Sequence, residues 1–319
     1  MLSEKGVCMT TGKIYLARPH GMCAGVRRAL AAVESVLAAA DGIVYVLHEI
    51  VHNEPIVRSL TRRGVRFVNS PEEVPEGGIL LFSAHGVGSG CEREARNRRL
   101  RVVDATCPLV KRLHRAAYEA GAAGVPVVLI GHRNHPEVEG IVGRMEPGTE
   151  IRVVESAAEI DALPFPAGTP VLRLCQTTLN TRETERLTSL LRRRFPAMRE
   201  GPGVCYATFQ RQEAVRRLAA VVPLVLIIGS ARSSNSNRLR EIAAESGAAA
   251  FLIDGPETLP LEALRNVTGV GVGAGASAPE HLVDATLEAL KRLGFGPDVS
   301  FVGEAVEEPR FLPPELPRF

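Results

Sequence analysis

The sequence of 319 residues contains no tryptophan, and aromatic residues make up only 4% of it. The charges nearly balance as well, with 38 Lys and Arg against 36 Asp and Glu. Nucleic-acid-binding surfaces usually combine an excess of positive charge with aromatic side chains that stack on bases. We therefore expect no nucleic-acid partner.

Long apolar runs are missing too. A membrane-spanning helix needs a run of about 18 apolar residues, and none is present, so we expect no membrane association. Residues 1–13 lack the apolar core of a signal peptide, which predicts a cytoplasmic location. Apolar residues at 45% and charged residues at 23% are ordinary for globular proteins and exclude a chain that is disordered throughout.

Cysteine is sparse, and no two cysteines form a CxxC pair. The six cysteines stand at positions 8, 23, 91, 107, 175 and 205. This is too few for a disulfide scaffold in a chain of this length. The close pairs typical of zinc fingers and ferredoxins are also absent, so local spacing alone predicts no metal site.

Short apolar segments alternate with amphipathic helical patterns along the whole chain. The apolar segments cover residues 14–16, 43–47, 79–83, 127–130, 171–174, 224–228 and 267–272. Strands that alternate with helices in this way indicate an α/β fold with parallel sheets. The length predicts two or three packed units.

Three of the cysteines each stand directly before a predicted helix: Cys23, Cys107 and Cys205. Pro108, which follows Cys107, suits a first helical turn. The free N–H groups of a helix N-terminus stabilise a thiolate or an anionic cluster. Taken singly, each cysteine is better explained as a small buried residue at the end of a strand.

Polar turns recur at similar distances from these cysteines. The first set occupies residues 48–53, 132–137 and 230–235, in which positions 52, 135 and 234 lie 29, 28 and 29 residues after the cysteine. A second set occupies 83–86, 176–179 and 275–278, at distances of 62, 70 and 72 residues. We infer three diverged copies of one α/β unit, at residues 13–106, 107–203 and 204–300, followed by a proline-rich tail at 301–319.

Parallel strands place such turns at one edge of each sheet, where ligands bind. Three such edges around a common axis would bring the three thiolates together with His52, His85, His135, Thr177, Ser233, Ser234, Asn235 and Ser277. Three thiolates can hold an iron–sulfur cubane with one open iron, or zinc with a water. Sulfur ligands accept both metals, so residue chemistry leaves the choice open.

The residues in the turns are mostly neutral hydrogen-bonding groups and histidines, which suits a phosphate or diphosphate. Read alone, Ser233 to Asn237 could simply cap a helix. Glu137 follows His135 by two residues and is a candidate proton donor. It could equally be an acidic residue favoured by the dipole of a first helical turn.

The motifs taken together resemble the 4-hydroxy-3-methylbut-2-enyl diphosphate reductase family, also called IspH or LytB. The resemblance covers residues 13–293 and rests on HGMCAGV at 20–26, HEIVHN at 48–53, FSAHGV at 82–87, DATCPLV at 104–110, GHRNHPEVEG at 131–140, QTTL at 176–179, CYAT at 205–208, NSNRL at 235–239 and GASAP at 275–279. Nine motifs in the family's order are far more specific than any one signature.

The resemblance implies a pseudo-threefold trefoil of α/β units around a central [4Fe-4S] cluster, with Cys23, Cys107 and Cys205 as ligands and one open iron. It implies that a diphosphate binds to His52, His85, His135, Ser233, Ser234, Asn235 and Ser277. Glu137 would supply protons, and Thr177 would orient the substrate alcohol. The implied reaction is a two-electron reductive dehydroxylation to isopentenyl and dimethylallyl diphosphate, with ferredoxin or flavodoxin as electron donor.

The chain departs from the usual family pattern beside two of the implied cluster ligands, at His20, Met22, Phe209 and Gln210. We interpret Cys8, Cys91 and Cys175 as non-ligands. Three other functions remain open: an iron–sulfur hydro-lyase that needs no reductant, a paralogue that acts on a related diphosphate, and a zinc-stabilised phosphate-binding module without catalysis.

Overall fold

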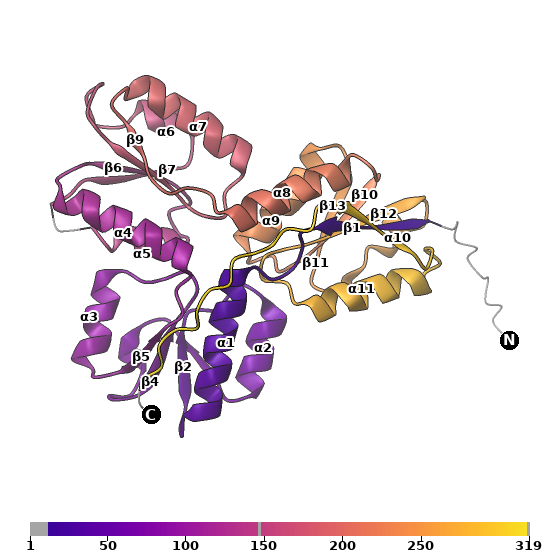
Figure 1. The fold of residues 1–319 in the computed structure, drawn as a ribbon, viewed down its shortest axis with the longest axis horizontal. Coiled ribbons are helices and arrows are strands. Elements are labelled where there is room, and N and C mark those ends of the chain that lie inside the picture. The colour runs from indigo at the N-terminus through magenta and orange to yellow at the C-terminus, as the bar shows by residue number, and fades with distance from the viewer. Residues whose placement is uncertain (1–11, 146–147, 318–319) are drawn as a thin grey trace. The chain divides into compact units, whose positions relative to one another are not determined.

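The computed structural model describes residues 12–145 and 148–317, so Cys8 lies outside the described residues. Thirteen strands in this part of the chain form three sheets, and every strand pair is parallel. Helices alternate with the strands (Figure 1). The predicted α/β class with parallel sheets is therefore confirmed.

The chain divides into two compact units. The first combines residues 1–23 with 207–308, and the second combines residues 24–206 with 309–319. None of the helices in the described ranges is both long and apolar enough to cross a membrane.

The first unit has one sheet of five strands. Their order is β11 (Ala249–Ile253), β10 (Leu224–Ile228), β12 (Gly269–Ala274), β1 (Lys13–Arg18) and β13 (Val299–Gly303). Its helices are α8 (Tyr206–Ala219), α9 (Ser234–Glu245), α10 (Leu261–Leu264) and α11 (Glu280–Arg292), with a 3₁₀ turn at Pro256–Thr258.

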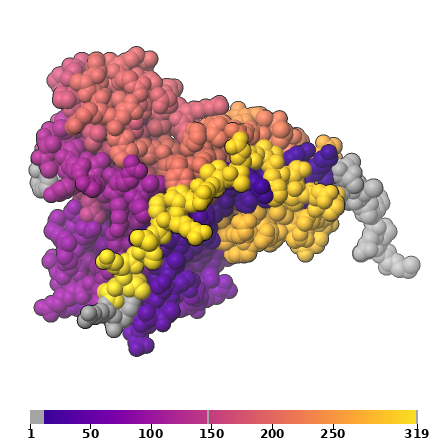
Figure 2. Space-filling view, viewed as in Figure 1, coloured from indigo at the N-terminus to yellow at the C-terminus, as the bar shows by residue number. Residues whose placement is uncertain are grey.

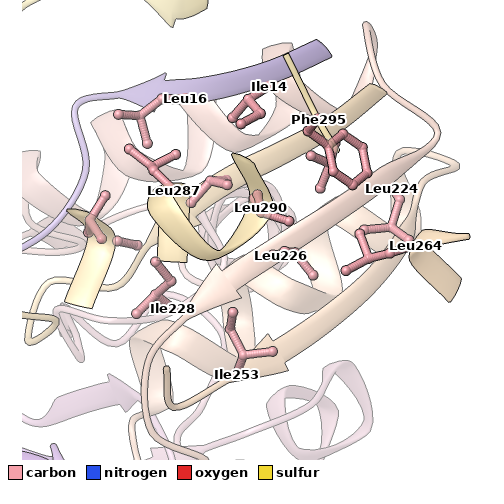
Figure 3. Close-up of a cluster of buried hydrophobic side chains, with 14 of the residues drawn as sticks. Ile14, Leu16, Leu224, Leu226, Ile228, Ile253, Leu264, Leu287, Leu290 and Phe295 are labelled. Atoms are coloured by element: carbon pink, nitrogen blue, oxygen red, sulfur yellow. The ribbon is translucent and has the colours of Figure 1, made fainter. Parts of the chain in front are cut away.

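Both faces of this sheet are covered, as the alternation of side chains along β10 shows. Leu224, Leu226 and Ile228 pack with α11 residues such as Leu290 (Figure 3). Val225 and Ile227, which point the other way, pack with residues of α8 and α9. Successive side chains of a strand face opposite sides, so a strand buried on both sides is apolar throughout.

The second unit has two sheets of four strands. One has the order β3 (Arg66–Val68), β2 (Val44–Leu47), β4 (Ile79–Phe82) and β5 (Arg101–Asp104), with α1 (Ala24–Ala39), α2 (Glu54–Arg62), α3 (Ser89–Asn97) and a 3₁₀ turn at Pro71–Glu73. The other has the order β7 (Ile151–Val154), β6 (Val127–Ile130), β8 (Leu172–Cys175) and β9 (Arg199–Glu200), with α4 (Pro108–Ala122), α5 (Pro136–Val142), α6 (Ala157–Asp161) and α7 (Thr181–Arg194).

The strand β1, which we expected at the start of the unit 13–106, belongs to another sheet. Ile14 pairs with Val270 of β12 on one side and with Val299 of β13 on the other. In this sheet β1 lies next to β12. The equivalent strand is β5, next to β4, in one sheet of the second unit, and β9, next to β8, in the other. The strand that precedes each cysteine is therefore the last strand of its repeat, and not the first strand of the next one. Apolar parallel strands look alike, so sequence order alone could not assign β1 to its sheet.

The C-terminal segment starts later than predicted, because residues 301–303 belong to β13. Residues 304–317 contain neither helix nor strand. In the first unit, Glu308 pairs with the buried Arg211 at 2.8 Å. In the second unit, the segment lies beside α1 (Figure 2), where Arg28 Nε donates to the Leu312 carbonyl at 2.7 Å.

Candidate active site

Two polar turns meet at the carboxyl edge of each sheet. The backbone N–H of Ala84 donates to the Ile50 carbonyl at 3.2 Å. The corresponding bonds in the other two sheets join Gln176 to Ile130 and Gly275 to Ile228, both at 2.9 Å. The two sets of turns found in the sequence are therefore neighbours in space within each sheet.

The three cysteines have equivalent local surroundings. The backbone N–H of Cys23 donates to the Ala276 carbonyl at 3.1 Å, that of Cys107 to Ala84 at 3.1 Å, and that of Cys205 to Thr177 at 3.2 Å. Each acceptor lies in the second polar turn of its own sheet. The helix that follows each cysteine begins at the next residue, at Ala24, Pro108 and Tyr206.

All three cysteines are reduced, outside any disulfide, and partly exposed. Cys175, by contrast, is fully buried, and burial raises the pKa of its thiol to about 11. Within residues 12–145 and 148–317, no three His, Cys, Asp or Glu side chains could hold a single metal ion. A cubane spreads its thiolate ligands over separate iron atoms, so its ligands need not meet at one ion.

Glu137 and Thr177 form a buried pair in the second unit. Thr177 donates to the Glu137 carboxyl twice, from its N–H at 2.6 Å and from its hydroxyl at 2.7 Å. Both residues are almost completely buried. Glu137 lies in the first turn of α5 after β6, and Thr177 follows β8, the neighbouring strand. The parallel pairing of these strands brings the two turns together.

Burial raises the pKa of Glu137 to about 7, although the two hydrogen bonds from Thr177 act in the opposite direction. Removing a carboxylate from water favours its neutral form, while donors to the carboxylate favour the charged form. A carboxyl with a pKa near 7 can both hold and release a proton at neutral pH.

Three predicted histidines lie together in the same unit. The rings of His52 and His85 are stacked with centroids 4.3 Å apart, and the His135 ring lies 5.8 Å from both. His135 also caps α5, because its Nδ1 accepts the N–H of Glu137 at 3.1 Å. The structure thus brings together five of the predicted residues: His52, His85, His135, Glu137 and Thr177.

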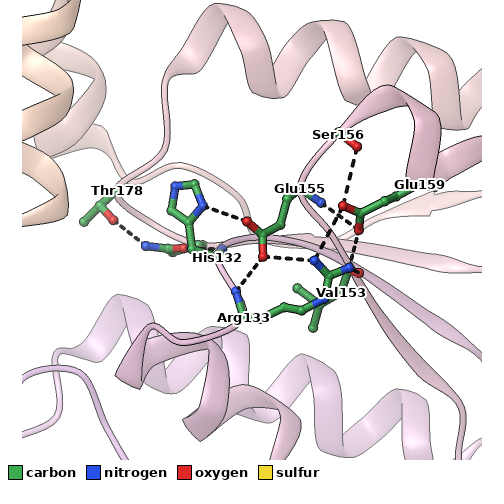
Figure 4. Close-up of polar contacts among 8 residues, drawn as sticks. His132, Arg133, Val153, Glu155, Ser156, Glu159 and Thr178 are labelled. Atoms are coloured by element: carbon green, nitrogen blue, oxygen red, sulfur yellow. Dashed lines mark hydrogen bonds and ion pairs between the residues drawn. The ribbon is translucent and has the colours of Figure 1, made fainter.

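Arg133 lies in the same turn as His135 but is engaged elsewhere (Figure 4). Its guanidinium pairs with Glu155 at 3.0 Å and with Glu159, and it donates to the Val153 carbonyl at 2.9 Å. This arginine is therefore tied to β7 and α6. Any anion at the three histidines would be bound by imidazole groups before this guanidinium.

The remaining predicted polar residues lie in the first unit. Ser233 caps α9, because its hydroxyl accepts the Ser236 N–H at 3.2 Å, so the capping interpretation is correct for this residue. Asn235 is buried, and neither its Oδ1 nor its Nδ2 has a partner among the described residues. Buried polar atoms are rarely left unpaired. Asn235 is therefore suited to a polar ligand.

Ser277 and Ser234 accompany Asn235 on the two turns of this sheet. Ser236, which was not among the predicted site residues, is fully buried. A Cβ at Gly275 would lie 2.2 Å from the Ser236 hydroxyl, so the turn that carries Ser277 approaches α9 as closely as a glycine allows.

Two other residues were missed in the second unit. Glu49 accepts a hydrogen bond from His52 Nδ1 at 2.9 Å and is itself buried. His114 packs under the turn that carries His85, since a Cβ at Gly86 would lie 2.5 Å from the His114 ring. Burial lowers the pKa of His114 to about 4. Apart from the residue types, no sequence pattern indicates these contacts.

Sequence comparison relates the chain to a group of reductases. It is 46% identical over 309 residues to a 4-hydroxy-3-methylbut-2-enyl diphosphate reductase of Tolumonas auensis, covering 95% of this chain and 99% of the relative. A protein of the same name from Burkholderia pseudomallei is 46% identical over 88% of this chain and 90% of its own length.

Solved structures give the same relationship. The structure of the E-1-hydroxy-2-methyl-but-2-enyl-4-diphosphate reductase from Plasmodium falciparum matches with a TM-score of 0.89 and 30% identity, over 95% of this chain and 96% of that one. A structure described as the terminal enzyme of the non-mevalonate pathway matches with a TM-score of 0.64 and 34% identity, over 88% and 99%. The family profile described as LytB protein matches residues 14–291. The chain therefore belongs to the LytB family.

Proposed function

We propose that this protein reduces (E)-4-hydroxy-3-methylbut-2-enyl diphosphate to isopentenyl diphosphate and dimethylallyl diphosphate. Two electrons and two protons enter, the C–O bond to the hydroxyl breaks, and the oxygen leaves as water. The observation that carries the proposal is the buried Glu137–Thr177 pair next to three histidines. A proton source beside an anion-binding group is what this reaction needs, and the relatives named above bear the name of this activity.

The diphosphate binds through N–H groups of His52, His85 and His135. Short hydrogen bonds from imidazole to phosphate oxygens are strong when the donor carries charge. By the family resemblance, Ser233, Ser234, Asn235 and Ser277 bind the same group. The unpaired side-chain atoms of Asn235 support that assignment.

Glu137 supplies protons to the reacting end of the substrate. Its pKa of about 7 leaves a large fraction of the carboxyl protonated at neutral pH. The Thr177 hydroxyl can turn from donor to acceptor, so it can orient the substrate alcohol and pass a proton between that alcohol and Glu137. His135 Nδ1 accepts the backbone N–H of Glu137. This hydrogen bond links a diphosphate-binding histidine directly to the residue that supplies protons.

Cys23, Cys107 and Cys205 are the proposed ligands of a [4Fe-4S] cluster. When bound, such a cluster with one open iron supplies electrons and Lewis acidity. The three thiols fit this role because each lies outside any disulfide, is partly exposed and stands next to the N-terminus of a helix. Their matching backbone bonds place the three cysteines in equivalent positions of three sheets, which supports one shared role.

The electrons come from a ferredoxin or flavodoxin in this proposal, and the protein works in the cytoplasm. A hydro-lyase would remove water without an external reductant, so dependence on a reductant separates the two reactions. A zinc-binding module would neither contain sulfide nor consume the substrate.

The test is to purify the protein without oxygen, measure iron, sulfide and zinc, and assay the hydroxylated diphosphate with a reduced low-potential dye. We expect iron and sulfide in equal amounts and consumption of two electrons per substrate. Consumption without added reductant would replace the proposal by a hydro-lyase. Zinc without sulfide, and no turnover, would overturn the enzymatic proposal altogether.

A further inference from the structure

The three histidines differ in what their Nδ1 atoms face. His135 Nδ1 accepts a backbone N–H, so this nitrogen is unprotonated and the ring carries its proton on Nε2. His85 Nδ1 lies 3.3 Å from the hydroxyl of Ser83, which can donate to it. His52 Nδ1 lies 2.9 Å from a carboxylate oxygen of Glu49. A carboxylate only accepts, so His52 must carry a proton on Nδ1.

This difference decides which ring can become cationic. A neutral His52 with its proton on Nδ1 would present a bare Nε2 to an anion, which repels it. Protonation of Nε2 makes His52 an imidazolium whose two N–H groups serve Glu49 on one side and the anion on the other. His135 and His85 can donate from Nε2 while they stay neutral.

We propose that Glu49 is a positioning residue that makes His52 the single imidazolium of the three histidines when a diphosphate binds. The inference rests on the function proposed above and adds a residue and a charge state to it. Glu49 does not touch the substrate. It acts through His52, as a carboxylate does behind a catalytic or metal-binding histidine.

The surroundings of the three rings favour a positive charge on only one of them. His52 faces Glu49, His85 and His135, and His48 stands close enough to influence His85. Three imidazolium rings at these separations would repel one another strongly in a partly buried site. Burial and the neighbouring histidines hold the pKa of His85 well below 6.5, and burial lowers that of His135 to about 4. Both rings are therefore neutral at pH 7.

The first test measures pyrophosphate binding to the anaerobically purified holoenzyme by calorimetry, for the wild type and for Glu49→Gln. The amide keeps the size of the side chain and removes its charge. We expect binding at pH 7 to weaken by about tenfold or more. Glu49→Asp should recover part of the affinity, because the carboxylate is kept at a less favourable distance.

Glu54→Gln is the matched control. Glu54 begins α2 five residues later, and its carboxyl pairs with the exposed Arg58. The variant loses the same charge on the same segment and should bind pyrophosphate as the wild type does. A similar loss in both variants would mean that general electrostatics, and not the Glu49–His52 bond, sets the affinity.

The second test needs no variant at Glu49. Nitrogen NMR of histidine-labelled holoenzyme with pyrophosphate at pH 7, with the signals of the eight histidines assigned by single His→Asn variants, should show that among His52, His85 and His135 one ring is protonated on both nitrogens and two are neutral and protonated on Nε2. His52→Asn should remove the doubly protonated signal. A signal from His85 or His135 in that state, or unchanged binding in Glu49→Gln, overturns the inference while leaving the proposed function intact. If the wild type neither binds pyrophosphate nor consumes the substrate, both are overturned.

Discussion

The carboxyl group of Glu137 accepts two hydrogen bonds from one residue, the N–H and the hydroxyl of Thr177, at 2.6 and 2.7 Å. Forty residues separate the two in the sequence, and the pairing of β6 with β8 joins them. The N–H can only donate, whereas the hydroxyl can reverse its role. A protonated Glu137 can therefore donate its proton to the hydroxyl oxygen of Thr177.

Replacing Glu137 by Gln should leave the fold intact and lower kcat by about 100- to 10,000-fold, the usual contribution of a positioned acid or base. The amide has nearly the same shape but cannot supply protons. Turnover is measured with the reduced dye, and iron content and pyrophosphate affinity are measured on the same samples. Wild-type turnover in the variant would remove Glu137 from the mechanism, and loss of iron would assign it a structural role instead.

The pH profile should report the same carboxyl. Since burial raises the pKa of Glu137 to about 7, the protonated form prevails below that pH and is lost above it. We expect kcat to fall about tenfold per pH unit on the alkaline side of 7 if Glu137 is the acid. The Glu137→Gln variant should show no such limb. A wild-type profile that stays flat between pH 6 and 9 would contradict the assignment.

Thr177→Val removes the hydroxyl and keeps the backbone N–H that holds Glu137. Donation from the hydroxyl lowers the pKa of Glu137, so its removal should shift the alkaline limb of kcat to higher pH. We also expect kcat to drop by about tenfold or more, because the relay is lost. Thr177→Ser restores a hydroxyl and should restore both properties. If Ser and Val behave alike, the hydroxyl has no role in proton transfer.

Single changes of Cys23, Cys107 or Cys205 to Ser should each reduce iron and sulfide well below about four atoms of each per chain, since a thiolate ligand is lost. Cys91→Ser and Cys175→Ser are the controls and should keep the wild-type content. Cys8→Ser extends the series to a residue outside the described range. Metal analysis on all six variants compares them directly, and full iron content in Cys107→Ser would break the proposed ligand set.

Glu308→Gln should destabilise the first unit. Arg211 is 1% exposed, and its guanidinium donates to the Gly21 and Ala207 carbonyls as well as to Glu308. Leaving a buried charge unpaired costs about 3 kcal/mol or more. The two carbonyls remain as partners, so we expect the free energy of unfolding to fall by about 2 kcal/mol.

The exposed Glu307 next to it provides the control, and Glu307→Gln should change the free energy of unfolding by less than about 0.5 kcal/mol. Chemical denaturation of anaerobically purified protein measures both variants. Equal midpoints for the two variants would show that the Arg211–Glu308 pair adds nothing to stability.

Much of the site could be predicted because parallel strands impose its layout. Turns that follow neighbouring strands must meet at one edge, and this rule alone predicts that Thr177 lies near Glu137. The N-terminal position of Cys107 on its helix follows from Pro108, whose ring suits the first turn.

Other features depend on contacts that no local pattern encodes. Glu49 and His52 are three residues apart in an irregular turn, where spacing does not determine which side chains touch. His114 supports the His85 turn only because Gly86 leaves room for its ring, with a φ of 77° that favours glycine. The sequence order placed β1 in the wrong sheet, because its partner strands follow more than 250 residues later.

The pairing of β1 also sets an order of events during synthesis. A ribosome adds about 5 to 20 residues per second, so β1 waits roughly 13 to 50 s for β12 to be made. During that time Ile14 and Leu16 have no sheet to enter, whereas residues 24–206, once made, contain all the strands of both sheets of the second unit. Strand β1 is thus made before its partner strands by a long interval and is among the last strands of this fold to be paired. A chain interrupted before β12 would leave β1 unpaired, and an unpaired apolar strand is a ready template for aggregation.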